Sequence, residues 1–385
     1  MTSPSVVWSY GLGADSTAAL VSAVHEGHFR GVPPDGWLVV TAIVGEEWPD
    51  TCELVEAEVL PLLASRRVRF AQVARGGPSK KDGICVLDDS RSPSRLHRRG
   101  PWTLSDDLRA GGTLPQVAGA HKCSMNFKGW PIERFLAGAV AGSYLHVMGY
   151  ETSSHERDRA ARDAAHDTAV RTGVYPLIDQ GWDRGMCEDY LLAQFGVLWP
   201  KSVCTFCPFS LTNTASRERV LDRYAADPQA GVPALVMEHL AVALNPLQGL
   251  AGKKKTLAGL LAADPRQEPA LGLLARRLDA MPWRLYEVRR AIAGPGQAAR
   301  SLRVLASGSR GEAAAALRRE AAARPGCELP AHDGIERGWL RHRADSGPST
   351  EWFLVAAPEG AVPKERKNFG LLWDKAQSAT ASALW

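Results

Sequence analysis

The sequence predicts an α/β protein with a doubly wound, mostly parallel sheet, followed by a mainly helical C-terminal region. Short apolar segments alternate with helical segments over the first part of the chain, a pattern typical of parallel sheets with crossover helices. Beyond about residue 211, alanine, leucine and arginine recur at helical spacing. We therefore predict two domains, residues 1–210 and residues 211–385.

In the first domain the expected strands and helices alternate along the chain. The opening unit is an apolar strand, a glycine-bearing turn and an Ala- and Leu-rich helix, which is how many parallel nucleotide-binding folds begin. Residues 76–116 are rich in Gly, Pro and Arg and lack sustained periodicity, so we expect a long active-site loop or lid there. Strands are expected at residues 6–8, 36–44, 68–73 and 144–149, and helices up to residue 20 and at residues 50–63, 131–140, 154–167 and 188–195.

In the second domain, helical spacing is clearest at residues 297–305 and 312–323. One apolar segment, EWFLVA at residues 351–356, suits a strand. The role of this domain is left open between binding an acceptor and binding a protein partner.

Composition and charge narrow the class of protein. The net charge of +4 is too small to indicate nucleic-acid binding by itself. A run of basic residues is more often a solvated loop or helix face than a binding site. No apolar run is long enough for a membrane span and no leader pattern opens the chain, so we expect a cytoplasmic protein without a membrane partner. Seven cysteines, odd in number and unevenly spaced, favour metal or redox chemistry over a disulfide framework. The basic clusters are Lys80–Lys81, Arg91–Arg99, Lys253–Lys255 and Arg341–Arg343.

The turn between the first strand and the first helix has the residues of a phosphate-binding loop. Its backbone N–H groups lie at a helix N-terminus, where the free amides and the helix dipole attract anions. Glycines let the backbone approach the anion closely and hydroxyl groups add donors, whereas Asp15 is expected to cap the helix or to help hold Mg²⁺. The alternative is an ordinary capped strand-to-helix turn. The candidate residues are Ser9, Gly11, Gly13, Asp15, Ser16 and Thr17.

The segment SYGLGADST, residues 9–17, is neither a Walker loop nor a dinucleotide fingerprint. It resembles the PP-loop of ATP pyrophosphatases, close to S-G-G-x-D-S, and the longer S-x-G-G-G-x-D-S-T form of the phosphoadenosine-phosphosulfate reductase superfamily. Leu12 stands where that family usually has glycine. The resemblance implies an adenine nucleotide α-hydrolase-like fold that binds ATP and Mg²⁺.

Later segments resemble further elements of the same superfamily, over residues 5–210. The segment VGEEWPDT at residues 44–51 is similar to its D-T-G-x-E-x-P-x-T element and contributes Glu47. The segment KCSMNFKGWPI at residues 122–132 is similar to C-[ST]-x-x-[FY]-K-x-x-P-[IL], so Lys128 is expected to meet a phosphate or sulfate group. In a segment similar to E-x-x-R-A, Arg159 is expected to face the nucleotide phosphates, the alternative being a surface ion pair with Glu156.

Four cysteines form the candidate metal site. Cys204 and Cys207 make a C-x-x-C knuckle whose thiolates can reach one metal centre, and Cys123 and Cys187 are the natural partners. The array resembles the four-cysteine cluster of adenylylsulfate reductases and of DNA-phosphorothioation sulfurtransferases, which implies a [4Fe-4S] cluster. Zinc, or ordinary thiols, are the alternatives, and whether three or four cysteines bind stays open.

The resemblance implies an ATP-dependent sulfurtransferase in which Asp15, Lys128 and Arg159 serve the reaction. An acceptor oxygen attacks the α-phosphorus and pyrophosphate leaves. Sulfur from a donor such as a cysteine desulfurase, carried by the iron–sulfur cluster or a persulfide, then displaces AMP. The acceptor is expected to be nucleic acid, as in DNA phosphorothioation or tRNA thiolation. The alternatives are an adenylylsulfate or phosphoadenylylsulfate reductase and a noncatalytic nucleotide or cluster sensor. A homodimer is also left open.

Overall fold

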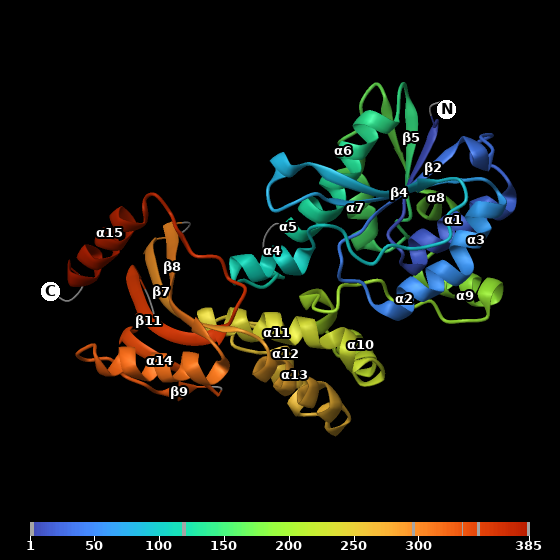
Figure 1. The fold of residues 1–385 in the computed structure, drawn as a ribbon. Helices are drawn as coiled ribbons and strands as arrows, with labels where there is room; N and C mark the ends of the chain where they lie inside the picture. The colour runs from blue at the N-terminus through green and yellow to red at the C-terminus, as the bar shows by residue number, and fades with distance from the viewer. Residues whose placement is uncertain (1–3, 118–120, 295–296, 333, 345–346, 383–385) are drawn as a thin grey trace. The chain divides into compact units, whose positions relative to one another are not determined.

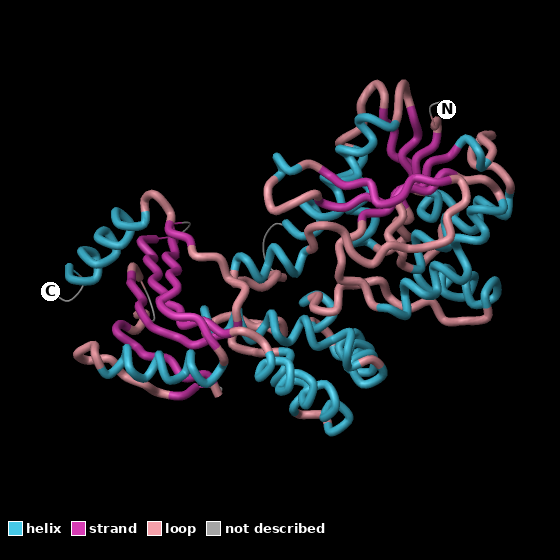
Figure 2. Tube along the Cα trace, in the orientation of Figure 1, coloured by secondary structure: helices cyan, strands magenta, loops and turns pink. Residues whose placement is uncertain are grey.

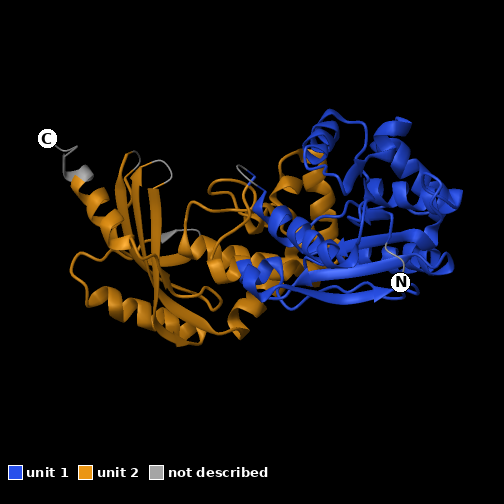
Figure 3. Ribbon diagram, turned by 90° about the horizontal axis from the view of Figure 1, so that it is seen from above, with its two compact units in different colours: residues 1–107, 117–205 blue, residues 108–116, 206–385 orange. Residues whose placement is uncertain are grey.

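The computed structural model describes residues 4–117, 121–294, 297–332, 334–344 and 347–382. The chain divides into two compact units, coloured separately in Figure 3. Unit 1 comprises residues 1–107 and 117–205, and unit 2 comprises residues 108–116 and 206–385. Within the described ranges, none of the helices has both the length and the apolar character that crossing a bilayer requires.

Unit 1 contains a six-stranded sheet in the order β4-β3-β2-β1-β5-β6. All neighbours pair in parallel except β3 and β4, so the antiparallel strand lies at one edge. The mixed α/β fold with a mostly parallel sheet, predicted from the alternating pattern, is thus confirmed (Figure 1). The strands are β1 (Val6–Ser9), β2 (Trp37–Ala42), β3 (Arg69–Arg75), β4 (Ile84–Ser90), β5 (Tyr144–Met148) and β6 (Arg171–Val174).

Helices pack on both faces of this sheet. Alternate residues of β1 point to opposite sides, so Val6 and Trp8 join the core formed with α1, α3 and α9, whereas Val7 joins the core formed with α6. The helices of this part of the chain are α1 (Ala14–Glu26), α2 (Pro49–Leu54), α3 (Leu60–Ser65), α4 (Leu104–Gly111), α5 (Lys122–Ser124), α6 (Trp130–Ala139), α7 (Ser154–Ala164), α8 (Pro176–Gln180) and α9 (Arg184–Phe195).

The strands predicted for unit 1 are confirmed to within a few residues, and the helix predicted at residues 50–63 is α2 and α3 joined by a π-helical turn at Val55–Val59. Pro61 explains that turn, because it cannot donate the backbone hydrogen bond that a regular helix needs there. The expectation of a long loop at residues 76–116 was wrong in part. That stretch contains β4 and α4, whose polar residues hide the strand and helix patterns.

Unit 2 corrects the prediction of a mainly helical C-terminal region. It contains a second sheet, whose strands are magenta in Figure 2. Its six strands have the order β12-β8-β7-β11-β10-β9, with antiparallel pairing throughout. Residues 297–305, predicted as helix, lie in β8, because pairing with β7 outweighs the helix propensity of Ala, Leu and Arg. The strands are β7 (Trp283–Gly294), β8 (Gln297–Gly308), β9 (Ala331–His332), β10 (Ile335–Arg341), β11 (Ser349–Pro358) and β12 (Lys364–Glu365).

Helices pack on both faces of the second sheet as well. Phe353 and Val355 of β11 contact α11 on one face, whereas Leu354 and Trp352 point to the other face, toward α14 and α15 respectively. The helix predicted at residues 312–323 is α14 and the strand predicted at residues 351–356 is β11, so both are confirmed. The helices are α10 (Thr214–Ala226), α11 (Pro228–Leu244), α12 (Leu257–Ala262), α13 (Glu268–Ala280), α14 (Arg310–Ala322) and α15 (Phe369–Ser382).

The carboxyl end of β5 determines where α1 begins. A Cβ atom at Gly149 would lie 2.5 Å from the Cα and 2.8 Å from the backbone N of Ser16, so only glycine allows the first turn of α1 this close to the sheet. Because β1 lies between β2 and β5, the turn from β1 into α1 opens at the carboxyl edge of the sheet where the strand order reverses. Ligands of open α/β sheets bind at that position.

We expect Gly149→Ala to destabilise unit 1 by about 1–3 kcal/mol, because backbone atoms rather than a flexible side chain must move. The measurement is hydrogen exchange of β1 and β5 peptides in the full chain. Gly138→Ala in α6 is the control, since a Cβ atom there meets nothing within 4 Å. That variant should leave stability unchanged or raise it by up to about 1 kcal/mol through helix propensity. Equal effects of the two substitutions would contradict the steric argument.

Candidate functional site

The first turn of α1 has free backbone donors. Gly13 is the residue that precedes the helix, and within the described part of the chain the helix start has no side-chain cap hydrogen bond. A helix start of this kind leaves N–H groups that water or an anion must satisfy. Gly11 is exposed and Gly13 is partly exposed, so the approach to these groups lies at the protein surface.

The hydroxyl groups predicted to donate to phosphate are partly used by the loop itself. Ser16 Oγ donates to the carbonyl of Gly13 over 3.0 Å and accepts from the N–H of Gly11 over 3.3 Å. Thr17 is fully buried, and its Oγ1 donates to the same carbonyl over 2.8 Å. In this structure, Thr17 therefore maintains the shape of the loop rather than facing its open side.

Leu12 holds an unusual backbone conformation. Its φ of 65° lies in the left-handed region, which glycine adopts without strain. The PP-loop that this turn resembles usually has glycine at the position of Leu12. The side chain is 7 % exposed and packs into the core of unit 1, while the Leu12 carbonyl accepts a hydrogen bond from Trp199 Nε1 over 2.9 Å. Burial and this hydrogen bond compensate for the local strain.

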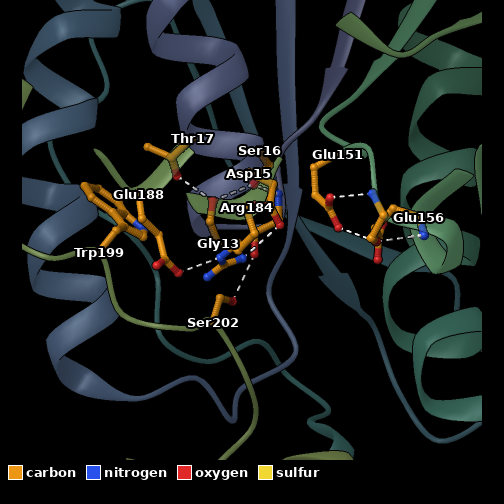
Figure 4. Close-up of polar contacts among 12 residues, drawn as sticks. Gly13, Asp15, Ser16, Thr17, Glu151, Glu156, Arg184, Glu188, Trp199 and Ser202 are labelled. Atoms are coloured by element: carbon orange, nitrogen blue, oxygen red, sulfur yellow. Dashed lines mark hydrogen bonds and ion pairs between the residues drawn. The ribbon is translucent and has the colours of Figure 1, made fainter. Parts of the chain in front are cut away.

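Asp15 is paired with an arginine that the sequence did not point to. Arg184, the first residue of α9, donates from one nitrogen to Asp15 Oδ2 over 2.8 Å and from another to Glu188 over 2.7 Å, so it lies between the two carboxylates (Figure 4). Burial raises the pKa of Asp15, and the Arg184 charge offsets part of that rise. Because Arg184 neutralises Asp15, the carboxylate repels an anion at the helix start less strongly.

The second oxygen of Asp15 is buried and has no hydrogen-bond partner among the described residues. Such an oxygen suits a hard cation or a donor group of a ligand. The predicted role of Asp15 in holding Mg²⁺ is therefore compatible with its surroundings.

Glu47 connects the loop after β2 to the segment that follows α9. Its carboxylate accepts from Ser202 Oγ over 2.5 Å and from the Val203 N–H over 3.1 Å. Ser202 Oγ also lies 3.0 Å from the Gly11 carbonyl, and its Cβ is the nearest atom to a Cβ built on Gly13. Burial raises the pKa of Glu47, while the Ser202 hydrogen bond and the charge of Lys128 oppose that rise.

Lys128 and Arg159 have different surroundings. Lys128 is exposed, and its charge acts on Glu47 in the loop after β2. Arg159 makes two hydrogen bonds to Glu156, of 2.7 and 2.9 Å, and stacks on the Tyr150 ring at 4.6 Å. The ion pair named as the alternative for Arg159 is therefore formed in this structure.

Ser9, at the end of β1, contacts a buried histidine. Ser9 Oγ lies 2.8 Å from Nε2 of His146 on β5, and Nδ1 of the same ring lies 3.0 Å from Nε of Arg171 on β6. Burial, and then the Arg171 charge, lower the pKa of His146 to about 4. The imidazole is therefore neutral at physiological pH.

The four predicted metal ligands divide between the two units of the chain. Across the described ranges, no group of three or more His, Cys, Asp or Glu side chains could hold a metal ion. Cys187 is fully buried in the core of unit 1, and burial raises the pKa of its thiol to about 12. Cys123 and Cys204 are partly exposed in unit 1, whereas Cys207 belongs to unit 2. The four-cysteine cluster therefore stays a prediction.

Arginines of the basic stretch at residues 91–99 are engaged within unit 1. Arg91 donates to the carbonyls of Asp35 and Arg67 over 2.7 and 2.8 Å. Arg98 lies 3.5 Å from Glu53, and Arg99 lies 3.6 Å from Asp106. These contacts weaken the argument that this stretch exists to bind nucleic acid.

Sequence reasoning missed Arg184, Trp199, Ser202 and His146, all of which contact the loop or its flanks. Each lies more than a hundred residues from its partner, beyond the range of local patterns. The one local signal in the sequence was Gly149, the glycine that follows β5, because a glycine there allows the backbone of Ser16 to approach closely.

Comparison of the chain with protein-family models, with curated proteins and with solved structures finds no match.

Replacing Arg184 should show how much an unpaired charge on Asp15 destabilises unit 1. We expect Arg184→Gln to lower the stability of unit 1 at pH 7 by about 1–2 kcal/mol, because a largely buried carboxylate loses its charged donor. Asp15→Asn combined with Arg184→Gln should lose less than Arg184→Gln alone. Arg30→Gln is the control, since its partner Asp179 is 3.4 Å away and both side chains are more than half exposed. The measurement is urea-dependent hydrogen exchange of α1, and an equal loss in the double variant would contradict the pairing.

The lowered pKa of His146 predicts a pH dependence. The unfolded chain takes up a proton near pH 6.5, whereas the folded chain does so only near pH 4, so stability is full above about pH 6.5 and falls between these values. The loss should reach about 3 kcal/mol. His146→Gln should remove this part of the pH dependence. The measurement is hydrogen exchange of β1 and β5 at pH 7 and pH 4.5, corrected for intrinsic exchange rates, and identical slopes in the two proteins would refute the prediction.

Proposed function

We propose that the protein is an ATP-dependent sulfurtransferase that adenylylates an acceptor oxygen and releases pyrophosphate. The observation that carries this proposal is the uncapped start of α1 at the carboxyl end of β1, next to Gly149. Free N–H groups, a helix dipole and a position where the strand order reverses together suit the phosphates of a nucleotide.

The charges around the loop support a polyphosphate ligand. Arg184 offsets the negative charge of Asp15, and Lys128 is exposed near Glu47 and available as a cation. Mg²⁺, held in part by Asp15, would neutralise charge on the phosphates of bound ATP. Arg159 would have to exchange Glu156 for a phosphate oxygen, because both of its contacts to that carboxylate are charge-assisted hydrogen bonds.

In the proposed reaction the loop amides and Lys128 bind the β- and γ-phosphates, so that the negative charge of departing pyrophosphate is stabilised. The acceptor oxygen attacks the α-phosphorus and forms an adenylylated intermediate. A sulfur nucleophile then displaces AMP. We propose nucleic acid as the acceptor on the sequence resemblance, and none of these steps requires a cluster held by the four cysteines.

The decisive experiment measures pyrophosphate release from ATP by the full chain, with tRNA, with DNA and without acceptor. Acceptor-dependent release supports the proposal. ATP binding without release in any arm would favour the sensor, and sulfite release from adenylylsulfate with thioredoxin would favour the reductase. We expect Lys128→Ala to reduce release at least about tenfold, which corresponds to about 1.4 kcal/mol of transition-state stabilisation. Lys81→Ala, which removes another exposed lysine, should have no effect.

The iron–sulfur cluster stays a separate prediction. Protein purified without oxygen should contain iron and sulfide in proportion, and Cys123→Ser and Cys204→Ser should remove both if these residues are ligands. Cys187, which is buried in the core of unit 1, decides between four ligands and three: Cys187→Ala should lower the iron content if four cysteines bind and leave it unchanged if three do. Zinc, or no metal, in the wild-type protein would refute the cluster.

A further inference from the structure

We infer that His146 is a positioning residue that orients the Ser9 hydroxyl so that its proton is donated to a phosphate oxygen in the loop. This inference rests on the proposed function, because it assigns one donor to the same nucleotide site. The geometry that carries it is a line of side chains running from α7 and β6 through β5 to the end of β1.

The direction of each hydrogen bond follows from Arg171. A guanidinium can only donate, so Nδ1 of His146, 3.0 Å from Arg171 Nε, must accept and carries no proton. The neutral ring therefore has its proton on Nε2. That N–H donates to Ser9 Oγ over 2.8 Å, and the hydroxyl oxygen becomes an acceptor. The Ser9 proton is then directed away from His146.

Arg171 is held in place by carboxylates. It donates to the two oxygens of Asp163 over 2.7 and 2.6 Å and to Asp167 over 2.6 Å, and Tyr175 donates to Asp163 as well. The Tyr144 ring lies 5.9 Å from the His146 ring. With its charge paired and its Nε aimed at His146, Arg171 disfavours a second proton on the ring, which would place two donors face to face.

The position of Ser9 makes the orientation useful. Ser9 is the last residue of β1 and is partly exposed, and its strand leads directly into the loop that precedes α1. A serine whose oxygen already accepts a hydrogen bond has one donor left, and donation to a phosphate satisfies both groups. His146 itself is only 6 % exposed and contacts Ser9, so it acts through that residue.

The test measures equilibrium binding of α,β-methylene ATP and of adenosine to the full chain. Ser9→Ala and His146→Leu should each weaken binding of the ATP analogue about tenfold and leave adenosine binding unchanged. The double variant should be no weaker than Ser9→Ala alone, because His146 acts only through that hydroxyl. His146→Gln, whose amide N–H can again donate to Ser9, should recover most of the affinity.

The outcomes separate the two proposals. Absence of analogue binding by the wild-type protein would overturn the proposed function and this inference with it. Binding by the wild type, with additive effects of Ser9→Ala and His146→Leu, would overturn only the role of His146. The role of His146 would also be overturned if His146→Leu lost adenosine affinity in parallel with affinity for the ATP analogue. The same holds if His146→Gln did not recover affinity although hydrogen exchange shows that this variant is folded.

Discussion

The close packing of α1 against the end of β5 is the contact on which the candidate site depends. Gly149 lets backbone meet backbone at Ser16, and this fixes where the first turn of α1 lies relative to the sheet. The other contacts of the loop build on that position. Trp199 donates a hydrogen bond to the carbonyl of Leu12, the Ser202 hydroxyl lies against the carbonyl of Gly11, and Arg184 donates to Asp15. The end of β5, the start of α9 and residues 199–202 are distant from one another in sequence, and together they support the turn between β1 and α1.

The sequence predicted the parallel core of unit 1 because its buried strands are continuous apolar runs separated by helices. It missed β4, whose residues Asp88 and Asp89 are polar edge positions that pair with β3. It also missed the sheet of unit 2. The burial pattern of β8 is irregular, with Ser301 and Leu302 buried in succession, and its Ala-, Leu- and Arg-rich composition suits a helix equally well until the partner strand is known.

The candidate site was predictable only where its residues are neighbours in the chain. The turn from Ser9 to Thr17 was recognised from local order, whereas Arg184 and His146 became visible only when β5, β6 and α9 were assembled around it. For the cysteines, spacing in the sequence did not show which of them are buried. Cys187 looked like a partner for the knuckle at Cys204, yet it lies on the face of α9 that packs into the core. The sequence alone did not show which face of α9 packs into the core and which face is exposed.

Leu12 has a consequence for how the loop would meet a ligand. A glycine at this position could adopt several backbone conformations before binding, whereas a leucine with its side chain in the core and its carbonyl held by Trp199 has essentially one. The turn is therefore preorganised, and an incoming anion need not pay the entropy of ordering it. The same rigidity limits adaptation, so selectivity among ligands of different size would come from groups around the turn rather than from the turn itself.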